Sequence, residues 1–396
     1  MLPENTLGWG QSRSCIRELF EYGLGRKALL GADKVYDFSL GNPNIPAPAC
    51  VNESIRQLLE TDPVELHGYT SAPGRPTLRK AIAADLNARW GTGLDMGDIY
   101  VTCGAAAGLA AALRGLLLPG EEVIAFAPFF PEYRVFTEAS GGVLVPVPPR
   151  PADFQIDFDA LRAAISEKTK VVIVNSPNNP SGVVLSRETL TTLAQILTEA
   201  CARYGHPIYL LSDEPYRELV YGEVEVPGLM TLYPHTLVCY SFSKSLSIPG
   251  ERIGYLAVCD RMEGRRQVFD SIAGAARALG YVNAPSLLQQ VAERCLGQTS
   301  DISKYKINRD LLYGGLTELG FDCVRPDGAF YLFVKTPEPD ALAFSEQAKK
   351  HELLLVPADD FGTPGYVRLA YCVSEKQIRD SMPAFKALAA QYGLCK

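Results

Sequence analysis

Apolar runs of strand length alternate with stretches of helical pattern over residues 98–259, and this alternation constrains the fold more than any other feature of the sequence. The runs are, in chain order, IYVTC, EVIAFA, KVVIVN, PIYLLSDEP, TLVCYS and RIGYLAVC. Nearly continuous apolar strands separated by helices indicate a mainly parallel sheet that is covered on both faces. Ligands of such open sheets bind outside the carboxyl ends of the strands. Those ends carry Gly104, Pro128, Asn175, Asp213 and Ser241.

The two ends of the chain have a different texture. Residues 14–30 space apolar side chains by three and four, as an amphipathic helix does, and a short strand and a Pro-rich loop follow within residues 34–48. Towards the C-terminus, long helices and short strands indicate a smaller α+β unit. The sequence therefore predicts an α/β protein with a three-layer large domain at residues 46–282 and a small C-terminal domain at 283–396. The N-terminal segment, residues 1–45, is expected to pack with the small domain.

The charge and the cysteine pattern disfavour several classes of protein. The 396 residues carry a formal net charge of −7, which would repel nucleic acid and anionic membranes at long range. The N-terminus lacks a basic region followed by an apolar stretch, and no run approaches the length of a membrane span. Ten scattered cysteines without a C-x-x-C pair and four isolated histidines predict neither a disulfide framework nor a metal site. We expect a cytoplasmic protein with reduced thiols.

The stretch YSFSKSLSIPGERIG, residues 240–254, places a lysine, an arginine and several serines between two apolar strands. A lysine that is screened from water loses its proton more readily than an exposed one, so the amine of Lys244 can act as a nucleophile and a base. A neutral amine forms a Schiff base with an aldehyde. Ser241, Ser243 and Arg252 are the groups expected to hold an anion attached to that aldehyde compound.

Three other strand ends carry polar groups that have two interpretations each. Gly104 begins an Ala-rich helix whose free N–H groups suit an anion, or which is simply tightly packed. NSPNNPSG, residues 175–182, forms turns, or it aims an asparagine amide at a ligand. Asp213 and Glu214 cap a helix, or a buried carboxylate there pairs with a protonated heterocyclic nitrogen, with Tyr216 close by. Together, the lysine, a carboxylate and an anion cradle predict a pocket for pyridoxal phosphate.

The same residues resemble the motifs of the class I and II aminotransferases, the aspartate-aminotransferase-like enzymes of fold type I that use pyridoxal phosphate. SFSKSLSIPGERIG is similar to the family signature S-x-S-K-x-x-x-x-P-G-x-R-x-G, and SDEPYREL is similar to the D-E-x-Y block. NSPNNPSG resembles N-P-x-N-P-T-G with a serine for the threonine, and YVRLAY resembles the block that carries the substrate-carboxylate arginine. The resemblance covers roughly residues 14–390, with the motifs in the expected order.

The resemblance implies a role around the cofactor for each matching residue. Lys244 would form the Schiff base and move the proton at the substrate α-carbon, and Asp213 would keep the pyridine nitrogen protonated. Tyr216 and Asn179 would hydrogen-bond the ring oxygen, and Phe130 would stack on the ring. The phosphate would lie beside Gly104 and would be held by the backbone N–H groups of Ala105 and Ala106 and by the side chains of Ser241, Ser243 and Arg252.

Substrate and subunit contacts are implied in the same way. Arg368 would clamp the substrate α-carboxylate, with help from the backbone of Gly41 and the amide of Asn179; as a lone arginine on a strand it would otherwise be a surface residue. Tyr69 matches a tyrosine that reaches the phosphate of the neighbouring subunit, so a homodimer with shared sites is expected. Where some aspartate-directed relatives have a lysine, this chain has Ala106. The basic residue that would bind the substrate's distal carboxylate in place of that lysine is left open among Arg13, Arg17 and Arg75.

The predicted function is that of a pyridoxal phosphate-dependent transaminase. An L-amino acid, with aspartate or an aromatic amino acid favoured, would donate its amino group to a 2-oxo acid such as 2-oxoglutarate. Because the shared apparatus labilises an α-bond, the motifs leave open a β-lyase, including a carbon–sulfur lyase, or another α-bond-cleaving enzyme. A cofactor-sensing regulator is disfavoured because residues 1–35 are too few for a DNA-binding domain. The missing Gly-rich fingerprint disfavours a nucleotide-dependent dehydrogenase.

Overall fold

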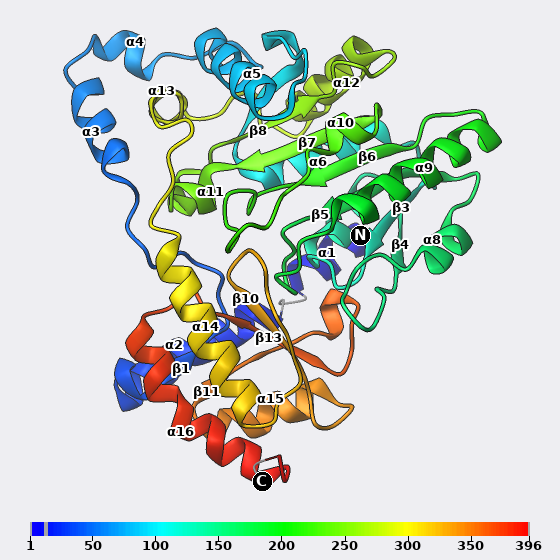
Figure 1. The fold of residues 1–396 in the computed structure, drawn as a ribbon. Coiled ribbons are helices and arrows are strands. Elements are labelled where there is room, and N and C mark those ends of the chain that lie inside the picture. The colour runs from blue at the N-terminus through cyan, green and yellow to red at the C-terminus, as the bar shows by residue number, and fades with distance from the viewer. Residues whose placement is uncertain (1, 12–14, 395–396) are drawn as a thin grey trace.

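The core of the protein is a seven-stranded sheet, seen in a computed structural model that describes residues 2–11 and 15–394 (Figure 1). Its strands are β2 (Ile99–Thr102), β3 (Glu122–Phe126), β4 (Val143–Val147), β5 (Thr169–Asn175), β6 (Tyr209–Asp213), β7 (Thr236–Ser241) and β8 (Gly254–Val258). They lie in the order β2-β8-β7-β6-β5-β3-β4. Only β8 runs against its neighbours, so the predicted mainly parallel sheet is confirmed. The carboxyl ends of β2, β3, β5, β6 and β7 therefore share one edge.

Helices cover both faces of this sheet, which explains why its strands are apolar throughout. On β5, Val171 and Ile173 belong to one buried cluster, whereas Val172 and Val174 belong to another. The first cluster is covered by α5 (Pro76–Trp90), α6 (Gly104–Leu116), α12 (Arg265–Ala278) and α13 (Ser286–Arg294). The second is covered by α8 (Phe158–Ala164), α9 (Arg187–Tyr204) and α10 (Leu229–Leu232). The expected three-layer α/β architecture is thus confirmed.

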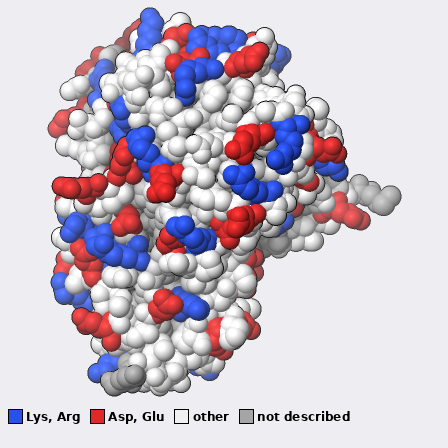
Figure 2. All heavy atoms as spheres, turned by 45° about the vertical axis from the view of Figure 1, so that its right-hand side comes forward, with Lys and Arg blue, Asp and Glu red and all other residues white. Residues whose placement is uncertain are grey.

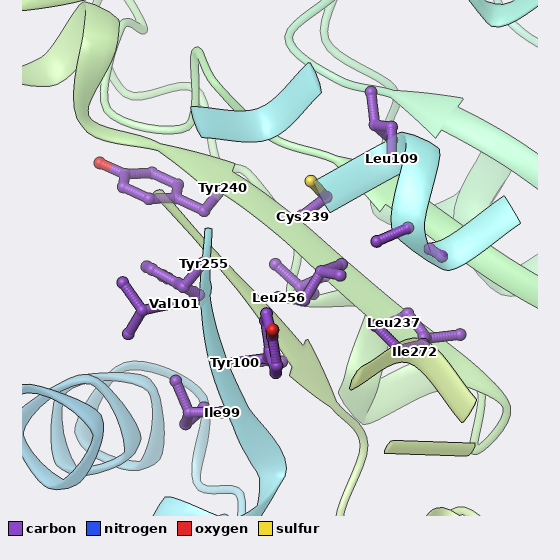
Figure 3. Close-up of a cluster of buried hydrophobic side chains, with 14 of the residues drawn as sticks. Ile99, Tyr100, Val101, Leu109, Leu237, Cys239, Tyr240, Tyr255, Leu256 and Ile272 are labelled. Atoms are coloured by element: carbon purple, nitrogen blue, oxygen red, sulfur yellow. The ribbon is translucent and has the colours of Figure 1, made fainter. Parts of the chain in front are cut away.

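The first cluster shows how the helices are held on the sheet (Figure 3). Leu109 of α6 lies near Cys239 of β7, and Ile272 of α12 lies near Leu237 of β7 and Leu256 of β8. The remaining helices of this part are α3 (Ala49–Leu58), α4 (Pro63–His67), α7 (Glu132–Ala139) and α11 (Phe242–Ser245). Helix α11 directly follows β7, so its residues are presented at the carboxyl edge of the sheet.

Both ends of the chain contribute to the second part of the molecule. It contains α2 (Cys15–Leu30), β1 (Tyr36–Asp37), α14 (Ser303–Glu318), β9 (Cys323–Val324), β10 (Tyr331–Lys335), α15 (Ala341–Lys349), β11 (Leu353–Leu354), β12 (Val356–Pro357), β13 (Tyr366–Ala370) and α16 (Glu375–Gln391). Strand β1 pairs in parallel with β11, and β13 lies between β12 and β10 (Figure 1). A separate buried cluster joins Phe38 from the N-terminal segment to Phe330 and Phe385. The early segment is therefore built into the C-terminal part.

The N-terminal helices differ in how well the sequence predicts them. Helix α2 matches the helix expected over residues 14–30, of which residue 14 lies outside the described residues. Helix α1 (Glu4–Gln11) was not predicted, and the indole nitrogen of Trp9 donates a hydrogen bond to Glu138 of α7 at 3.4 Å. Helix α13, which follows the expected boundary, packs against α3 and α5. Domain limits at residues 45 and 282 stay a prediction.

The molecular surface mixes charges of both signs. On the face shown in Figure 2, Lys and Arg are interspersed with Asp and Glu over the described residues. That face therefore presents no extended area of one sign. Among the described residues, no helix is long and apolar enough to cross a bilayer.

Candidate active site

A pocket of about 530 Å³ opens at the carboxyl edge of the sheet, between the two parts of the molecule. The predicted residues that line it are Gly41, Ala105, Ala106, Phe130, Asn179, Asp213, Tyr216, Ser241, Ser243, Lys244, Arg252 and Arg368. They come from the loop between β1 and α3, from α6, α11 and β13, from the last residues of β6 and β7, and from the loops after β3, β5 and β6 and before β8. The fold thus collects side chains that are more than 300 positions apart in the sequence.

Lys244 reaches this pocket from the short helix α11. The hydroxyl of Ser241 accepts a hydrogen bond from the Ser243 amide and begins the helix at the end of β7. The amine Nζ donates a hydrogen bond of 2.8 Å to the carbonyl oxygen of Gly41. The pKa of the Lys244 amine is lowered to about 8, mainly by burial and also by the positive charges of Arg252 and Arg368, while Cys372 acts in the opposite direction. A substantial neutral fraction therefore exists near neutral pH, as a nucleophile requires.

Asp213 is the one carboxylate of its strand end that lacks a cationic partner. Its neighbour Glu214 forms a buried ion pair of 2.6 Å with Arg217 and accepts the Ser212 hydroxyl. Residues 215–218 form turns, so no helix follows Asp213 and Glu214, and the alternative that they cap a helix is wrong. The Tyr133 hydroxyl donates to Asp213 Oδ2 at 2.6 Å, whereas Oδ1 has no hydrogen-bond partner among the described residues.

The environment of Asp213 suits a protonated ring nitrogen. Complete burial raises the pKa of its carboxyl to about 7, although the Tyr133 hydrogen bond acts in the opposite direction. A cation placed at the free Oδ1 would restore the charged carboxylate, because an opposite charge offsets the cost of burial. A pyridinium N–H supplies both the charge and the hydrogen bond that this oxygen lacks.

Arg368 is buried on β13 rather than exposed, so the alternative of a surface arginine is wrong. Its Nη1 donates to the side-chain oxygen of Asn179 at 3.2 Å, and Nη2 donates to the carbonyl oxygen of Ser39. Nε has no partner within the described part of the chain. The rings of Tyr331 and Phe361 flank the guanidinium at 4.8 and 5.2 Å. A buried guanidinium held by neutral oxygens requires an anion, and a carboxylate is the matching one.

A second anion site lies at the N-terminus of α6. Cys103 precedes this helix without a side-chain cap, so the dipole and the first N–H groups of the helix face the pocket at Ala105 and Ala106. Gly104 has φ +80°, and a Cβ there would lie 2.8 Å from Nη2 of Arg252. The hydroxyls of Ser241 and Ser243 hydrogen-bond each other at 2.7 Å beside them. These donors fit the phosphate of pyridoxal phosphate.

The asparagine-rich segment, residues 175–182, both forms a turn and presents an asparagine side chain to the pocket. The Asn178 side chain accepts the Ser181 amide at 2.9 Å, and the Asn175 side chain accepts the Asn179 amide at 2.7 Å. The turn is therefore held by its own side chains, and it delivers Asn179 to the pocket.

Several expected residues lie elsewhere. Tyr69 is fully exposed and lines a separate open hollow together with Arg75, which pairs with Glu65 at 3.8 Å. Arg17 lines the main pocket, and Arg13 lies outside the described residues. Of the arginines left open by the sequence, Arg17 is thus the described one that shares the pocket.

The sequence does not predict two tyrosines of the site. Tyr133 lies three residues after Phe130, and their rings meet edge to face at 5.8 Å. Tyr331 begins β10, and its hydroxyl lies 2.9 Å from that of Tyr216. The spacing of Tyr133 from Phe130 was a usable signal. Tyr331 stood in an ordinary strand pattern, FYLFV, that gave none.

A buried lysine amine, an unpaired carboxylate and a phosphate cradle at one sheet edge define a fold type I enzyme that uses pyridoxal phosphate. Residues 33–384 match the family "Aminotransferase class I and II". The chain therefore belongs to the class I and II aminotransferases, and it is a pyridoxal phosphate-dependent transaminase. The predicted family, cofactor and enzyme class are confirmed.

Relatives and solved structures agree with this membership. An aspartate/prephenate aminotransferase from Thermus thermophilus is 33% identical over 357 residues, which cover 87% of this chain and 88% of the relative. The solved structure of an amino transferase from Eubacterium rectale is 51% identical, with a TM-score of 0.97 and 99% of both chains covered. The solved structure of an aspartate aminotransferase from Thermus thermophilus with maleate is 28% identical, with a TM-score of 0.87. The match covers 98% of this chain and 99% of that structure's chain.

Proposed function

We propose that this chain transfers the amino group of an L-amino acid, aspartate or an aromatic amino acid, to a 2-oxo acid such as 2-oxoglutarate. The observation that carries the proposal is the pairing, in one pocket, of the Lys244 amine with the buried guanidinium of Arg368. Both substrates of such a reaction carry an α-carboxylate, which the guanidinium would bind. Relatives named aspartate aminotransferase support aspartate as a donor.

The chain's own residues account for the chemistry around the substrate. Bound pyridoxal phosphate withdraws electrons from the substrate α-carbon. Lys244 would take the α-proton and return it at the C4′ carbon of the cofactor, and a pKa of about 8 suits an amine that gains and loses protons near neutral pH. Asp213 would hold a proton on the ring nitrogen through its Oδ1, which has no hydrogen-bond partner among the described residues.

Orientation follows from the polar groups that surround these two residues. Arg368 fixes the α-carboxylate and thereby sets which face of the α-carbon meets Lys244. The Asn179 oxygen is engaged by Arg368, which leaves its amide nitrogen to donate to the ring oxygen beside Tyr216. Phe130 would stack on the ring, while Ala105, Ala106, Ser241, Ser243 and Arg252, which line the pocket beside Gly104, would hold the phosphate.

The remaining wall of the pocket bears on the substrate side chain. Ile16, Phe20 and Leu109 offer an apolar surface that suits an aromatic amino acid, and Ala106 offers no cation. Arg17 lines the same pocket and is our candidate for binding the distal carboxylate of aspartate or 2-oxoglutarate. An Arg17→Ala variant should then lose more activity with aspartate than with phenylalanine.

A panel of amino donors and 2-oxo acceptors tests the proposal. Aspartate, tyrosine, phenylalanine and cysteine are each supplied with 2-oxoglutarate, and glutamate, pyruvate, ammonia and sulfide are measured. Stoichiometric glutamate without ammonia supports amino transfer, whereas ammonia with pyruvate, or sulfide, would identify a β-lyase. Lys244→Ala should abolish the reaction, and Lys304→Ala, which changes an exposed lysine, should leave it intact.

Two further expectations accompany this function. We propose a homodimer in which Tyr69 enters the neighbouring site, because a fully exposed tyrosine beside exposed Val64 is a candidate contact surface. We also propose a cytoplasmic location, since the nine described cysteines carry free thiols.

A further inference from the structure

Tyr331 stands where the cofactor half and the substrate half of the pocket meet. It is the first residue of β10, is 3% exposed, and lines the pocket with Arg368 and Tyr216. β10 pairs with β13, so the strand that carries Tyr331 and the strand that carries Arg368 are neighbours. The position of Tyr331 is thus fixed by the same sheet that fixes the arginine.

The hydroxyl of Tyr331 contacts the large-domain side of the site. It lies 2.9 Å from the hydroxyl of Tyr216, and the two rings meet edge to face at 5.7 Å. Burial raises the pKa of both phenols, so both hydroxyls keep their protons at neutral pH. When the Tyr216 hydroxyl donates to another acceptor, the Tyr331 hydroxyl can donate to the Tyr216 oxygen. A chain of two hydroxyls polarises the outer donor and fixes its direction.

The ring of Tyr331 contacts the substrate side of the site. The Arg368 guanidinium lies 4.8 Å from the ring centroid, within the range of a cation–π contact. Gly41 makes room for the tyrosine, since a Cβ at Gly41 would lie 2.1 Å from the Tyr331 hydroxyl oxygen. The carbonyl oxygen of Gly41 accepts a hydrogen bond from the Lys244 amine. Tyr331 therefore contacts Tyr216 and Arg368 directly, and it packs against Gly41, whose carbonyl oxygen binds Lys244.

We infer that Tyr331 is a positioning residue that directs the Tyr216 hydroxyl at the cofactor ring oxygen and braces Arg368 for the substrate carboxylate. The inference rests on the proposed roles of Tyr216 and Arg368. The two functions can be tested separately, because the Tyr331 hydroxyl contacts Tyr216 whereas the Tyr331 ring contacts Arg368. Tyr331→Phe removes the first function alone, and Tyr331→Leu removes both.

The test uses the holoenzyme and reads the pH midpoint of the bound cofactor's visible absorbance. A weaker donor from Tyr216 leaves more negative charge on the ring oxygen beside the Lys244 nitrogen, which favours a proton there. Tyr331→Phe should therefore raise the midpoint by about 0.5–1 pH unit. Tyr216→Phe should raise it further, and the Tyr216→Phe/Tyr331→Phe double variant should match Tyr216→Phe alone.

The second readout is the dissociation constant of maleate, an unreactive dicarboxylate. Tyr331→Phe should change it by no more than about two-fold, since the ring remains, whereas Tyr331→Leu should weaken binding about 3- to 30-fold. Tyr371→Phe is the matched control, because its buried hydroxyl faces Tyr221 at 3.4 Å and does not line the pocket. That variant should leave both readouts unchanged.

Failure of this inference can be distinguished from failure of the proposed function. If wild-type protein shows no pH-dependent cofactor absorbance, the proposed role of Lys244 is wrong. If wild type shows it and Tyr331→Phe leaves the midpoint unmoved, the inference is overturned. An additive double variant would likewise overturn it, because the two hydroxyls would then act separately.

Discussion

Arg368 shows at the scale of one residue why a buried cation needs a ligand. Its guanidinium is held by neutral oxygens and two rings, so removing it costs no ion pair within the described structure. Arg368→Leu should weaken binding of amino and 2-oxo acids about 10- to 150-fold, the worth of a charge-assisted contact, while cofactor content stays near that of the wild type. Substrate KM and bound cofactor are measured on the same preparation. Loss of cofactor would mean that the arginine is structural.

Asp213 gives a pH dependence whose sign follows from its buried carboxyl. The folded, cofactor-free protein keeps a proton on Asp213 up to a pKa of about 7, whereas the unfolded chain loses it near its ordinary value of 3.8. Between those values the folded state binds more protons, so the free energy of unfolding falls as the pH rises. The contribution reaches at most about 4 kcal/mol.

Asp213→Asn removes that titration and tests it directly. Relative to wild type, the cofactor-free variant should gain thermal stability as the pH is raised from 5 to 7, and the gain should level off above pH 8. Melting temperatures of both apoproteins over this range provide the comparison. A constant difference at every pH would show that Asp213 ionises normally in the folded protein.

Individual residues were predictable where their chemical type was unusual for their position. A lysine, a carboxylate and an arginine next to apolar strands have few reasons to be there, so Lys244, Asp213 and Arg368 could be singled out. Tyr133 had only its spacing from Phe130 to mark it, and Tyr331 had nothing, because tyrosine is common beside apolar strands. Their importance comes from partners 80 and 115 positions away, which only the folded chain brings close.

At the scale of elements, the N-terminus of α6 is the clearest case of local structure serving a ligand. Gly104 and Gly120 both have positive φ, +80° and +84°, so alanine strains the backbone similarly at either position, by about 1–2 kcal/mol. Only at Gly104 would the new Cβ meet Arg252, because nothing lies within 4 Å at Gly120. Gly104→Ala should weaken pyridoxal phosphate binding about ten-fold or more, through displacement of Arg252.

Gly120→Ala serves as the control for that substitution. It should lower the melting temperature by a similar amount and leave the cofactor dissociation constant unchanged. Equal cofactor affinities in the two variants would argue against a phosphate at the start of α6.

Elements were predictable in proportion to their burial. Six strands of the seven-stranded sheet are apolar because both faces are covered, and the sequence predicts them in order. It does not predict β4, which lies at the edge of the sheet and is only partly buried. Helix α1 buries none of its residues and has a polar pattern, so nothing in its sequence marked it. The pairing of β1 with β11 spans only two residues in each strand and joins positions more than 300 apart, which no local pattern encodes.

At the scale of the whole molecule, the exposed Tyr69 leads to a test of shared sites. A mixed dimer of Tyr69→Ala and Lys244→Ala subunits would contain one complete site, with Lys244 from one subunit and Tyr69 from its partner. Each variant alone should have low activity, and refolding them together should restore it. Sedimentation velocity checks that the wild type and both variants are dimers.

No recovery on mixing, with dimers present, would show that Tyr69 acts within its own subunit or not at all. Assembly is the level at which the sequence was least informative. Only the resemblance of one motif pointed to a second subunit. The sequence of one chain does not distinguish a tyrosine that contacts another subunit from any other exposed tyrosine.

The most direct test of the central claim is to map the lysine that binds the cofactor. The purified holoenzyme is reduced with borohydride, digested, and analysed by mass spectrometry for the peptide that carries the pyridoxyl group. We predict a single tagged lysine, Lys244, at close to one group per chain, and no tag in Lys244→Ala. A tag on another lysine, or a Lys244→Ala protein that still acquires one, would contradict the account.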